Sequence, residues 1–235
     1  MKKLHNLYKI EDIENLSIKQ IKSIYKKNIN PSLIQTIGKL SFANDLIHKA
    51  EGQYIYTNCG KKILDFTGGY GVLSHGHNNK KIINSRINFQ KKKKMEVHKN
   101  ILSPYLACLS HNISTLLPEG LNKVFLPNSG AEANEGAIKL AYKYFNGNKK
   151  YILHSDISFH GKLLGTGSIS NSEEINFKFQ GLEFKDFFKY NNIDSLRDVV
   201  KRYKNDIYAI ILEPFSASTL TPLNNEFLIT LKDIC

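Results

Sequence analysis

Arginine is scarce in this sequence of 235 residues, which contains only Arg86, Arg197 and Arg202 although its formal net charge is +12. A basic surface attracts nucleic acids and anionic membranes. Proteins that read nucleic-acid sequences, however, depend on the planar guanidinium group, which lysine does not provide. We therefore expect no nucleic-acid partner, and we interpret the lysine run at residues 91–94 as the solvated face of a helix.

Cysteine and long apolar runs are scarce as well. The three cysteines, at positions 59, 108 and 235, lie far apart, and none belongs to a Cys-x-x-Cys pair. A reduced, cytoplasmic location is therefore expected. No window has the length of a membrane span, and the N-terminus lacks an apolar stretch of signal-peptide length, so no membrane partner is expected. His75 and His77 suggest a metal site, but the sequence offers no third ligand near them, and we expect no metal.

Two familiar phosphate-binding motifs are also missing. The chain contains no GxxxxGKS/T sequence, and the glycines that follow Gly161 lack the GxGxxG spacing of a dinucleotide-binding turn. ATP, GTP and NAD sites are therefore unsupported.

The N-terminal region predicts helix followed by a hairpin. Residues 7–29 are polar with scattered isoleucine and leucine, which predicts helical structure. Strand-forming runs at residues 54–56 and 63–66 flank a turn, as in a β-hairpin. A shift in composition near residue 100 is the only candidate domain boundary.

A glycine cluster follows this hairpin. Gly68, Gly69 and Gly71 surround Tyr70. Glycine adopts backbone conformations that other residues resist, so the backbone here can approach a ligand closely. A tight bend without a ligand is the alternative interpretation.

From about residue 120 onward, short apolar runs alternate with amphipathic stretches. The expected strands are residues 124–126, 151–153 and 208–212, and the expected helices are residues 132–145, 194–203 and 227–234. This alternation is typical of βαβ units with a largely parallel sheet. We therefore predict an α/β fold, in which ligands lie at the carboxyl ends of the strands.

The junction at residues 128–130 joins one of these strands to an alanine-rich helix. The first turn of a helix has N–H groups without partners and a partial positive charge, which together favour a bound phosphate. Ser129 can add a hydroxyl donor, Gly130 gives access to the backbone, and the N–H groups of Gly130 and Ala131 are expected to point outward. Ser129 is equally a common N-cap residue, worth about 1 kcal/mol without any ligand. Local chemistry therefore leaves both interpretations open.

Five segments resemble one enzyme family. The stretch LPNSGAEANEGAIKLAYKYF resembles the phosphate cup of class III aminotransferases, which are pyridoxal-phosphate enzymes of fold type I. The other similar segments, in the family's order, are YIYTNCGKKILDFTGGYGVLSHGHNNKKI (hairpin and glycine turn), SPYLACLSHNISTLLPEGLNKVF (helix and strand before the cup), HSDISFHGKLLGTGSIS (ring-stacking loop) and IYAIILEP (strand ending in Glu-Pro). The resemblance implies a partial fold type I structure, with an N-terminal segment at residues 1–100 and an incomplete cofactor-binding large domain at residues 101–235.

The resemblance also implies roles for single residues. Ser129, Gly130 and Ala131 would hold the phosphate of pyridoxal 5'-phosphate. Phe159 would stack on the pyridine ring, with core packing as its alternative role. Glu213 would lie near the substrate side of the cofactor.

Further implied features concern the substrate and the catalytic groups. Tyr70 would line the substrate entrance, and His160 would be structural. The Schiff-base lysine and the acidic partner of the pyridinium nitrogen follow the Glu-Pro strand in the family, so we expect both to lie beyond Cys235 and expect no catalytic residue within this chain.

The expected function is the transfer of an amino group between an amine or amino acid and a keto acid or aldehyde. Members of the family act as dimers, so we expect a homodimer or a complementary C-terminal chain as partner. The alternative is a catalytically inactive remnant, or a partner subunit of a split aminotransferase. The choice of substrate, and of transamination over an intramolecular amino shift or decarboxylation, stays open at this point.

Overall fold

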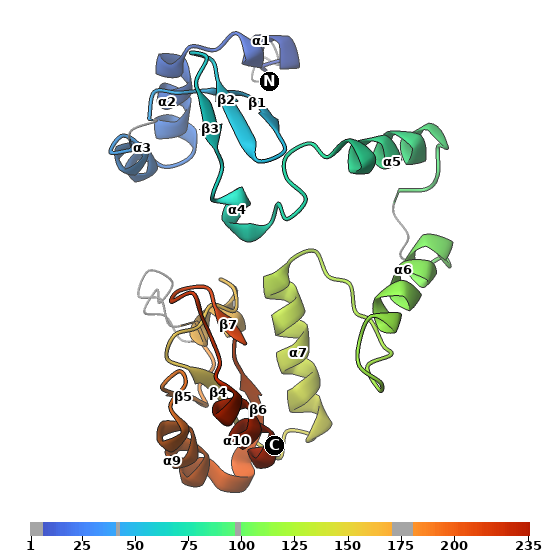
Figure 1. Ribbon diagram of the computed structural model, residues 1–235, viewed down its shortest axis with the longest axis vertical. Helices are drawn as coiled ribbons and strands as arrows, with labels where there is room; N and C mark the ends of the chain where they lie inside the picture. Colours follow the sequence, from blue (N-terminus) through green and yellow to red (C-terminus); the bar gives the residue numbers. More distant parts are fainter. Residues whose placement is uncertain (1–6, 41–42, 97–99, 171–180) are drawn as a thin grey trace, which may run out of the picture. The chain divides into compact units, whose positions relative to one another are not determined.

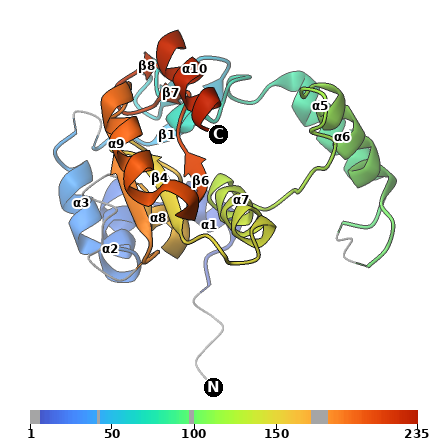
Figure 2. The same ribbon diagram turned by 90° about the horizontal axis from the view of Figure 1, so that it is seen from below.

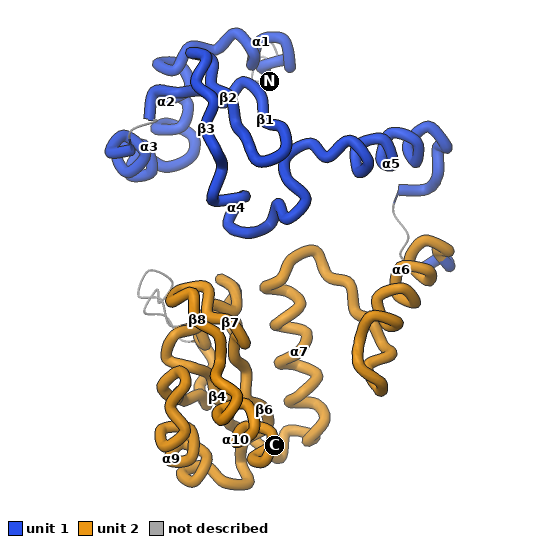
Figure 3. Tube along the Cα trace, viewed as in Figure 1, with its two compact units in different colours: residues 1–102 blue, residues 103–235 orange. Residues whose placement is uncertain are grey.

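The computed structural model describes residues 7–40, 43–96, 100–170 and 181–235 (Figure 1). The chain divides into two compact units, residues 1–102 and residues 103–235 (Figure 3). The separate domain roles expected on either side of residue 100 stay predictions. Within the described ranges, no helix has both the length and the apolar character needed to cross a membrane.

The first unit combines short helices with an antiparallel sheet. Its elements are α1 (Ile10–Glu14), α2 (Ile18–Asn28), α3 (Pro31–Ile37), β1 (Ile47–Glu51), β2 (Tyr54–Thr57), β3 (Lys62–Leu64), α4 (Gly68–Gly71) and α5 (Lys80–Lys91). The strands pair in the order β1-β2-β3. The predicted hairpin is therefore confirmed as β2 and β3, and β1 adds a third strand that the sequence did not indicate.

One expectation for this unit is wrong. The helix predicted to carry the lysine run at residues 91–94 ends at Lys91. Lys93 has a φ of 47°, a left-handed conformation that cannot continue a right-handed helix. Most of the lysine run therefore lies after the helix.

The second unit has the α/β architecture that the sequence predicts. Its elements are α6 (Pro104–Thr115), α7 (Gly130–Tyr144), β4 (Tyr151–Ser155), α8 (Leu164–Ser168), β5 (Lys185–Phe188), α9 (Ile193–Tyr203), η2 (Lys204–Asp206), β6 (Ile207–Ile211), β7 (Phe215–Ser216), β8 (Thr221–Pro222) and α10 (Asn225–Ile234). The main sheet has the order β5-β4-β6, and both of its ladders are parallel. The carboxyl ends of these strands therefore meet at one edge.

The strand predicted at residues 124–126 is wrong. This segment forms no ladder with any part of the chain that the structure describes, and Phe125 is 66% exposed. Both edges of β4 are already paired, one with β5 and the other with β6. An apolar run becomes a strand only when a neighbour supplies hydrogen bonds, and no described strand supplies them here.

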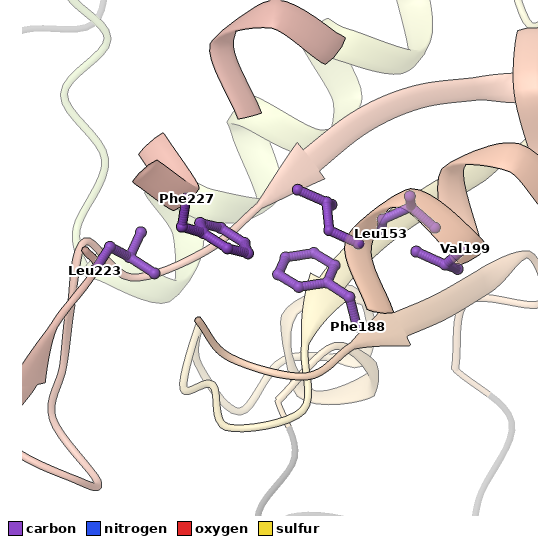
Figure 4. Close-up of a cluster of buried hydrophobic side chains, with 6 residues drawn as sticks. Leu153, Phe188, Val199, Leu223 and Phe227 are labelled. Carbon is purple, nitrogen blue, oxygen red and sulfur yellow. The ribbon is translucent and has the colours of Figure 1, made fainter. Parts of the chain in front are cut away.

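Two apolar clusters hold the parallel sheet between helices. Successive side chains of a strand point to opposite faces, so Ile152 and Leu153 of β4 enter different clusters. Ile152 packs in a cluster with Ile138 of α7, whereas Leu153 packs in a cluster with Phe188, Val199 and Phe227, among others (Figure 4). Figure 2 shows α7 and α9 on opposite sides of β4 and β6. The packing fixes both helices relative to the strand ends.

The next residue of β4, His154, gives the fold a pH dependence. Its side chain is buried, and burial lowers the pKa of His154 from 6.5 to about 4. The unfolded chain therefore binds a proton near pH 6.5 that the folded chain takes up only near pH 4. The stabilising contribution of neutral His154 is fully present above pH 6.5 and is lost as the pH falls, so we expect the free energy of unfolding to drop by about 3 kcal/mol between pH 6.5 and pH 4.

Urea denaturation at several pH values measures this drop. His154→Asn is the comparison, because it keeps an N–H near the position of Nδ1, which lies 2.9 Å from the carbonyl oxygen of Ser155. The original chain should lose more stability than the variant over this pH range. Parallel pH profiles for the two chains would contradict the assignment to His154.

Candidate functional site

The start of α7 is fixed by a reciprocal cap. Ser129 has extended backbone angles, and its Oγ accepts a hydrogen bond from the backbone N–H of Glu132 at 3.2 Å. The Glu132 carboxylate in turn accepts from the N–H of Asn128 at 2.6 Å. The N-cap interpretation of Ser129 is therefore confirmed, and the helix begins at Gly130.

The cap leaves the first helical N–H groups available. Within the described chain, the N–H groups of Gly130 and Ala131 have no hydrogen-bond acceptor. A β-carbon at Gly130 would meet no atom within 4 Å, so the backbone is open on that side of the first residue of the helix. Ser129 Oγ acts as an acceptor in the cap, which leaves its own hydroxyl hydrogen free to donate. Three donors and the positive end of the helix dipole together suit an anion.

A loop after β4 packs directly against the first turns of α7. The side-chain amide of Asn134 donates to the carbonyl oxygen of His160 at 2.8 Å. Gly161 has a φ of 130°, and a β-carbon there would lie 2.5 Å from the Cβ of Ala131. The loop therefore approaches the helix as closely as glycine allows. Phe159, on the same loop, remains 47% exposed, more than core packing would leave it.

Glu213 ties this loop to the chain that follows β6. One carboxylate oxygen accepts from the backbone N–H of Phe159 at 2.7 Å, and the other accepts from the N–H of Ala217 at 3.0 Å. The two residues of the first bond are 54 positions apart. Glu213 thus fixes the main chain at Phe159, and its expected place on the substrate side of a cofactor stays a prediction.

His160 is the next residue of the loop and is buried. Its side chain is 5% exposed, and its Nε2 has no hydrogen-bond partner within the part of the chain that the structure describes. Burial lowers the pKa of His160, while the charge of Glu213 opposes this shift. The imidazole is therefore neutral near pH 7. The described residues contain no group of three or more His, Cys, Asp or Glu side chains arranged for a metal ion.

Several residues that hold the loop were not predicted. Asn134 and Glu135 lie on the inner side of α7, and the Glu135 carboxylate accepts from the N–H of Thr166 at 2.9 Å. Ser170 accepts from the N–H of His160 at 2.8 Å. The asparagine carried a usable signal, because asparagine is a poor helix former in the interior of an otherwise alanine-rich helix.

Tyr70, the residue expected at a substrate entrance, belongs to the other unit. Its side chain is 100% exposed, and its φ is 60°. It lies in α4, between glycines that also have positive φ. The second unit thus contains Ser129, Gly130, Ala131, Phe159 and Glu213, whereas Tyr70 lies in the first unit.

Removing the charge of Glu213 is expected to loosen the Phe159 loop. In Glu213→Gln the amide keeps one acceptor oxygen, while its NH₂ group faces a backbone donor, either that of Phe159 or that of Ala217. We expect a loss of about 1 to 2 kcal/mol in the free energy of unfolding, measured by urea denaturation. Hydrogen exchange at the Phe159 amide should also become faster. The control is Glu119→Gln in an exposed turn, which should change stability by less than about 0.5 kcal/mol. Equal effects of the two substitutions would contradict the assigned role.

Comparison with known proteins adds to this geometry. The family model described as aminotransferase class-III matches residues 40–235. The LysW-aminoadipate semialdehyde/glutamate semialdehyde transaminase of Sulfurisphaera tokodaii is 32% identical over 189 residues, which cover 80% of this chain and 47% of that protein. The acetylornithine aminotransferase of Prochlorococcus marinus subsp. pastoris is 32% identical over 222 residues, covering 87% of this chain and 50% of that protein.

Solved structures agree on the fold. The adenosylmethionine-8-amino-7-oxononanoate aminotransferase from Methanocaldococcus jannaschii matches with a TM-score of 0.80 at 22% identity, covering 92% of this chain and 52% of that one. A structure described as a transaminase with PLP bound matches with a TM-score of 0.69 at 16% identity, covering 94% of this chain and 53% of that one. The predicted fold type I architecture is thereby confirmed, and this chain spans about half the length of the proteins that it matches.

Proposed function

Because this chain belongs to the class III aminotransferase family, as its sequence predicts, we propose that it is the N-terminal half of a pyridoxal-phosphate-dependent transaminase. Pyridoxal 5'-phosphate is the cofactor of this family. The observation that carries the proposal is the start of α7, where two N–H groups have no acceptor among the described residues and the Phe159 loop packs against the same helix.

The residues of the second unit fit this cofactor. Gly130 and Ala131 would hold the phosphate through their backbone N–H groups, and Ser129 would hold it through its hydroxyl. The exposed ring of Phe159 would pack on the pyridine ring, while Glu213 holds the main chain of Phe159 in place. When bound, pyridoxal phosphate supplies the electron sink that lets an amino group leave one carbon skeleton and join another.

The proposed reaction moves an amino group between an amine or amino acid and a keto acid or aldehyde. The two relatives above are named for acetylornithine and for semialdehyde substrates, which fit this general reaction and differ from each other. Tyr70 is proposed to line the substrate entrance. The proposed setting is the cytoplasm, since the three cysteines are free and exposed.

We further propose that the Schiff-base lysine and the acidic partner of the pyridinium nitrogen lie outside residues 1–235, and that these residues alone do not catalyse transfer. The partner would be a complementary C-terminal half, within a homodimer or as a separate chain. Coverage of about half of each relative supports this arrangement, and it equally supports the alternative of an inactive remnant or split-enzyme subunit.

Reading the coding DNA beyond the codon for Cys235 separates these alternatives. An in-frame extension that encodes an aspartate and a lysine at matching positions, with amino transfer by the longer product, supports the enzyme. An early stop codon without a complementary gene supports the remnant.

Trapping of the cofactor tests the placement of the lysine. Borohydride reduction of residues 1–235 mixed with pyridoxal phosphate, followed by peptide mass spectrometry, should give no site-specific lysine adduct. An adduct is site-specific here if Ser129→Asp abolishes it. Such an adduct would refute the proposal that the nucleophile lies elsewhere.

A further inference from the structure

The glycine turn of the first unit has an unusual backbone. All four residues of α4 have positive φ: 48° at Gly68, 62° at Gly69, 60° at Tyr70 and 81° at Gly71. Glycine adopts this conformation readily, but a tyrosine does so at a cost of about 1 to 2 kcal/mol. Tyr70 is nevertheless held there with its side chain fully exposed. Strain of this kind persists only where surrounding contacts enforce it, and it is common at functional sites.

The contacts that enforce the turn converge on Asp65. One oxygen of its carboxylate accepts from the N–H and the hydroxyl of Thr67, at 2.9 and 2.7 Å, and from the N–H of Gly68 at 3.1 Å. The other oxygen accepts from Nε2 of His77 at 2.8 Å. The hydroxyl of Thr67 and the imidazole of His77 hold the pKa of Asp65 well below its usual value. The carboxylate therefore stays ionised and keeps all four hydrogen bonds at neutral pH.

His77 is itself anchored at a second point. Its N–H donates to the carbonyl oxygen of Gly52 at 2.7 Å, and its carbonyl oxygen accepts from the N–H of Gly52 at 2.9 Å. Gly76 packs so closely on the backbone of Gly52 that a β-carbon at Gly76 would lie 2.9 Å from the Gly52 oxygen. The backbone of His77 is thus fixed to the loop between β1 and β2, and its imidazole holds Asp65. Asp65 and His77 form a clamp between the antiparallel sheet and α4.

We propose that Asp65 and His77 are positioning residues that hold α4 in its left-handed form, so that Tyr70 meets the substrate as a preorganised contact. The role of Tyr70 toward substrate rests on the proposed function, whereas the clamp itself rests on the hydrogen bonds above. Preorganisation lowers the entropy lost on binding, because the backbone that carries Tyr70 is already fixed. Neither Asp65 nor His77 needs to touch the substrate for this purpose.

Substitutions at His77 separate a hydrogen-bonding role from simple packing. His77→Phe keeps a ring of similar size but cannot donate to Asp65. His77→Gln keeps an N–H donor, because its amide nitrogen extends about as far from the backbone as Nε2 of histidine. If the clamp positions the turn, Phe should release it and Gln should restore it in part. If His77 only fills space, Phe should be the better replacement.

Amide hydrogen exchange in the full chain measures how far α4 opens in each His77 variant, and it does so without any substitution at Tyr70. The amides of Gly71 and Leu73 donate within the turn, to the carbonyl oxygens of Thr67 and Gly68 at 3.0 and 2.9 Å. In His77→Phe we expect their exchange to become about 10-fold faster or more, with a smaller change in His77→Gln. Amides of β2 should be unaffected. Asp45→Asn is the matched control, because it removes the ion pair with Lys61 in the same unit without touching the turn.

A fluorescent probe gives a second measurement at the tyrosine itself. The sequence contains no tryptophan, so Tyr70→Trp places a single fluorophore on the turn. Its anisotropy should fall when His77→Phe is added and should recover with His77→Gln. Equal exchange rates and equal anisotropy in all three backgrounds would overturn the clamp. Neither measurement uses cofactor or substrate, so the clamp can fail while pyridoxal phosphate still binds at Ser129, and the reverse.

In an assembled enzyme, the same variants test the link to substrate. His77→Phe is expected to raise KM for the amino donor several-fold with a smaller change in kcat, and His77→Gln to restore KM. A loss confined to kcat would contradict a positioning role for Tyr70.

Discussion

Ser129→Asp is expected to weaken the binding of pyridoxal phosphate at least about 100-fold, because two unit charges about 4 Å apart near a protein surface repel by about 4 kcal/mol. Aspartate is as good an N-cap as serine, so α7 should still begin at Gly130 and the free energy of unfolding should change little. The substitution therefore acts on the anion and not on the helix.

Equilibrium dialysis against pyridoxal phosphate measures this loss. Ser129→Asn is the matched control, since asparagine caps helices equally well and carries no charge. It should bind far more tightly than the aspartate variant. If asparagine and aspartate weakened binding equally, or if neither changed it, the phosphate would not lie at the start of α7.

Gly161→Ala is expected to destabilise the second unit by roughly 2 to 5 kcal/mol, from backbone strain together with overpacking. The φ of 130° is one that residues with a side chain rarely adopt. The new β-carbon would also lie 2.5 Å from the Cβ and 2.9 Å from the Cα of Ala131, and the latter atom belongs to the backbone. The Phe159 loop would have to move away from α7, so cofactor binding should weaken as well.

Urea denaturation and pyridoxal phosphate binding should thus change together in Gly161→Ala, unlike in Ser129→Asp. Gly167→Ala provides the control on α8, where the nearest atom to a new β-carbon is 3.7 Å away and φ is not positive. It should be close to neutral. A stable Gly161→Ala chain with normal binding would show that the close approach of loop and helix is not required.

Local patterns predicted the parts of the fold that depend on local chemistry. The N-cap role of Ser129 was one of the two interpretations that the sequence offered, because a short polar side chain before an apolar-periodic stretch satisfies helix N–H groups wherever it occurs. The alternation of strands and helices gave the parallel sheet, since β4 and β6 are apolar runs of strand length. The short strand β5 was missed because its sequence, KDFF, carries two charges and lies at an edge of the sheet.

Contacts between distant segments could not be predicted in this way. Nothing near Glu213 indicates that its carboxylate binds the N–H of a residue 54 positions earlier. The clamp between Asp65 and His77 likewise depends on the path of the chain through the turn at Gly52. The error at residues 124–126 has the same origin, because an apolar run indicates burial but not the identity of a pairing strand.

The proposed function requires that a phosphate binds at the first turn of α7. A crystal structure of residues 1–235 with pyridoxal phosphate tests it directly. Phosphate oxygens are expected about 3 Å from the backbone nitrogens of Gly130 and Ala131, with the pyridine ring against Phe159. A structure in which the phosphate lies elsewhere, or in which a side chain of the protein occupies this position, would contradict it.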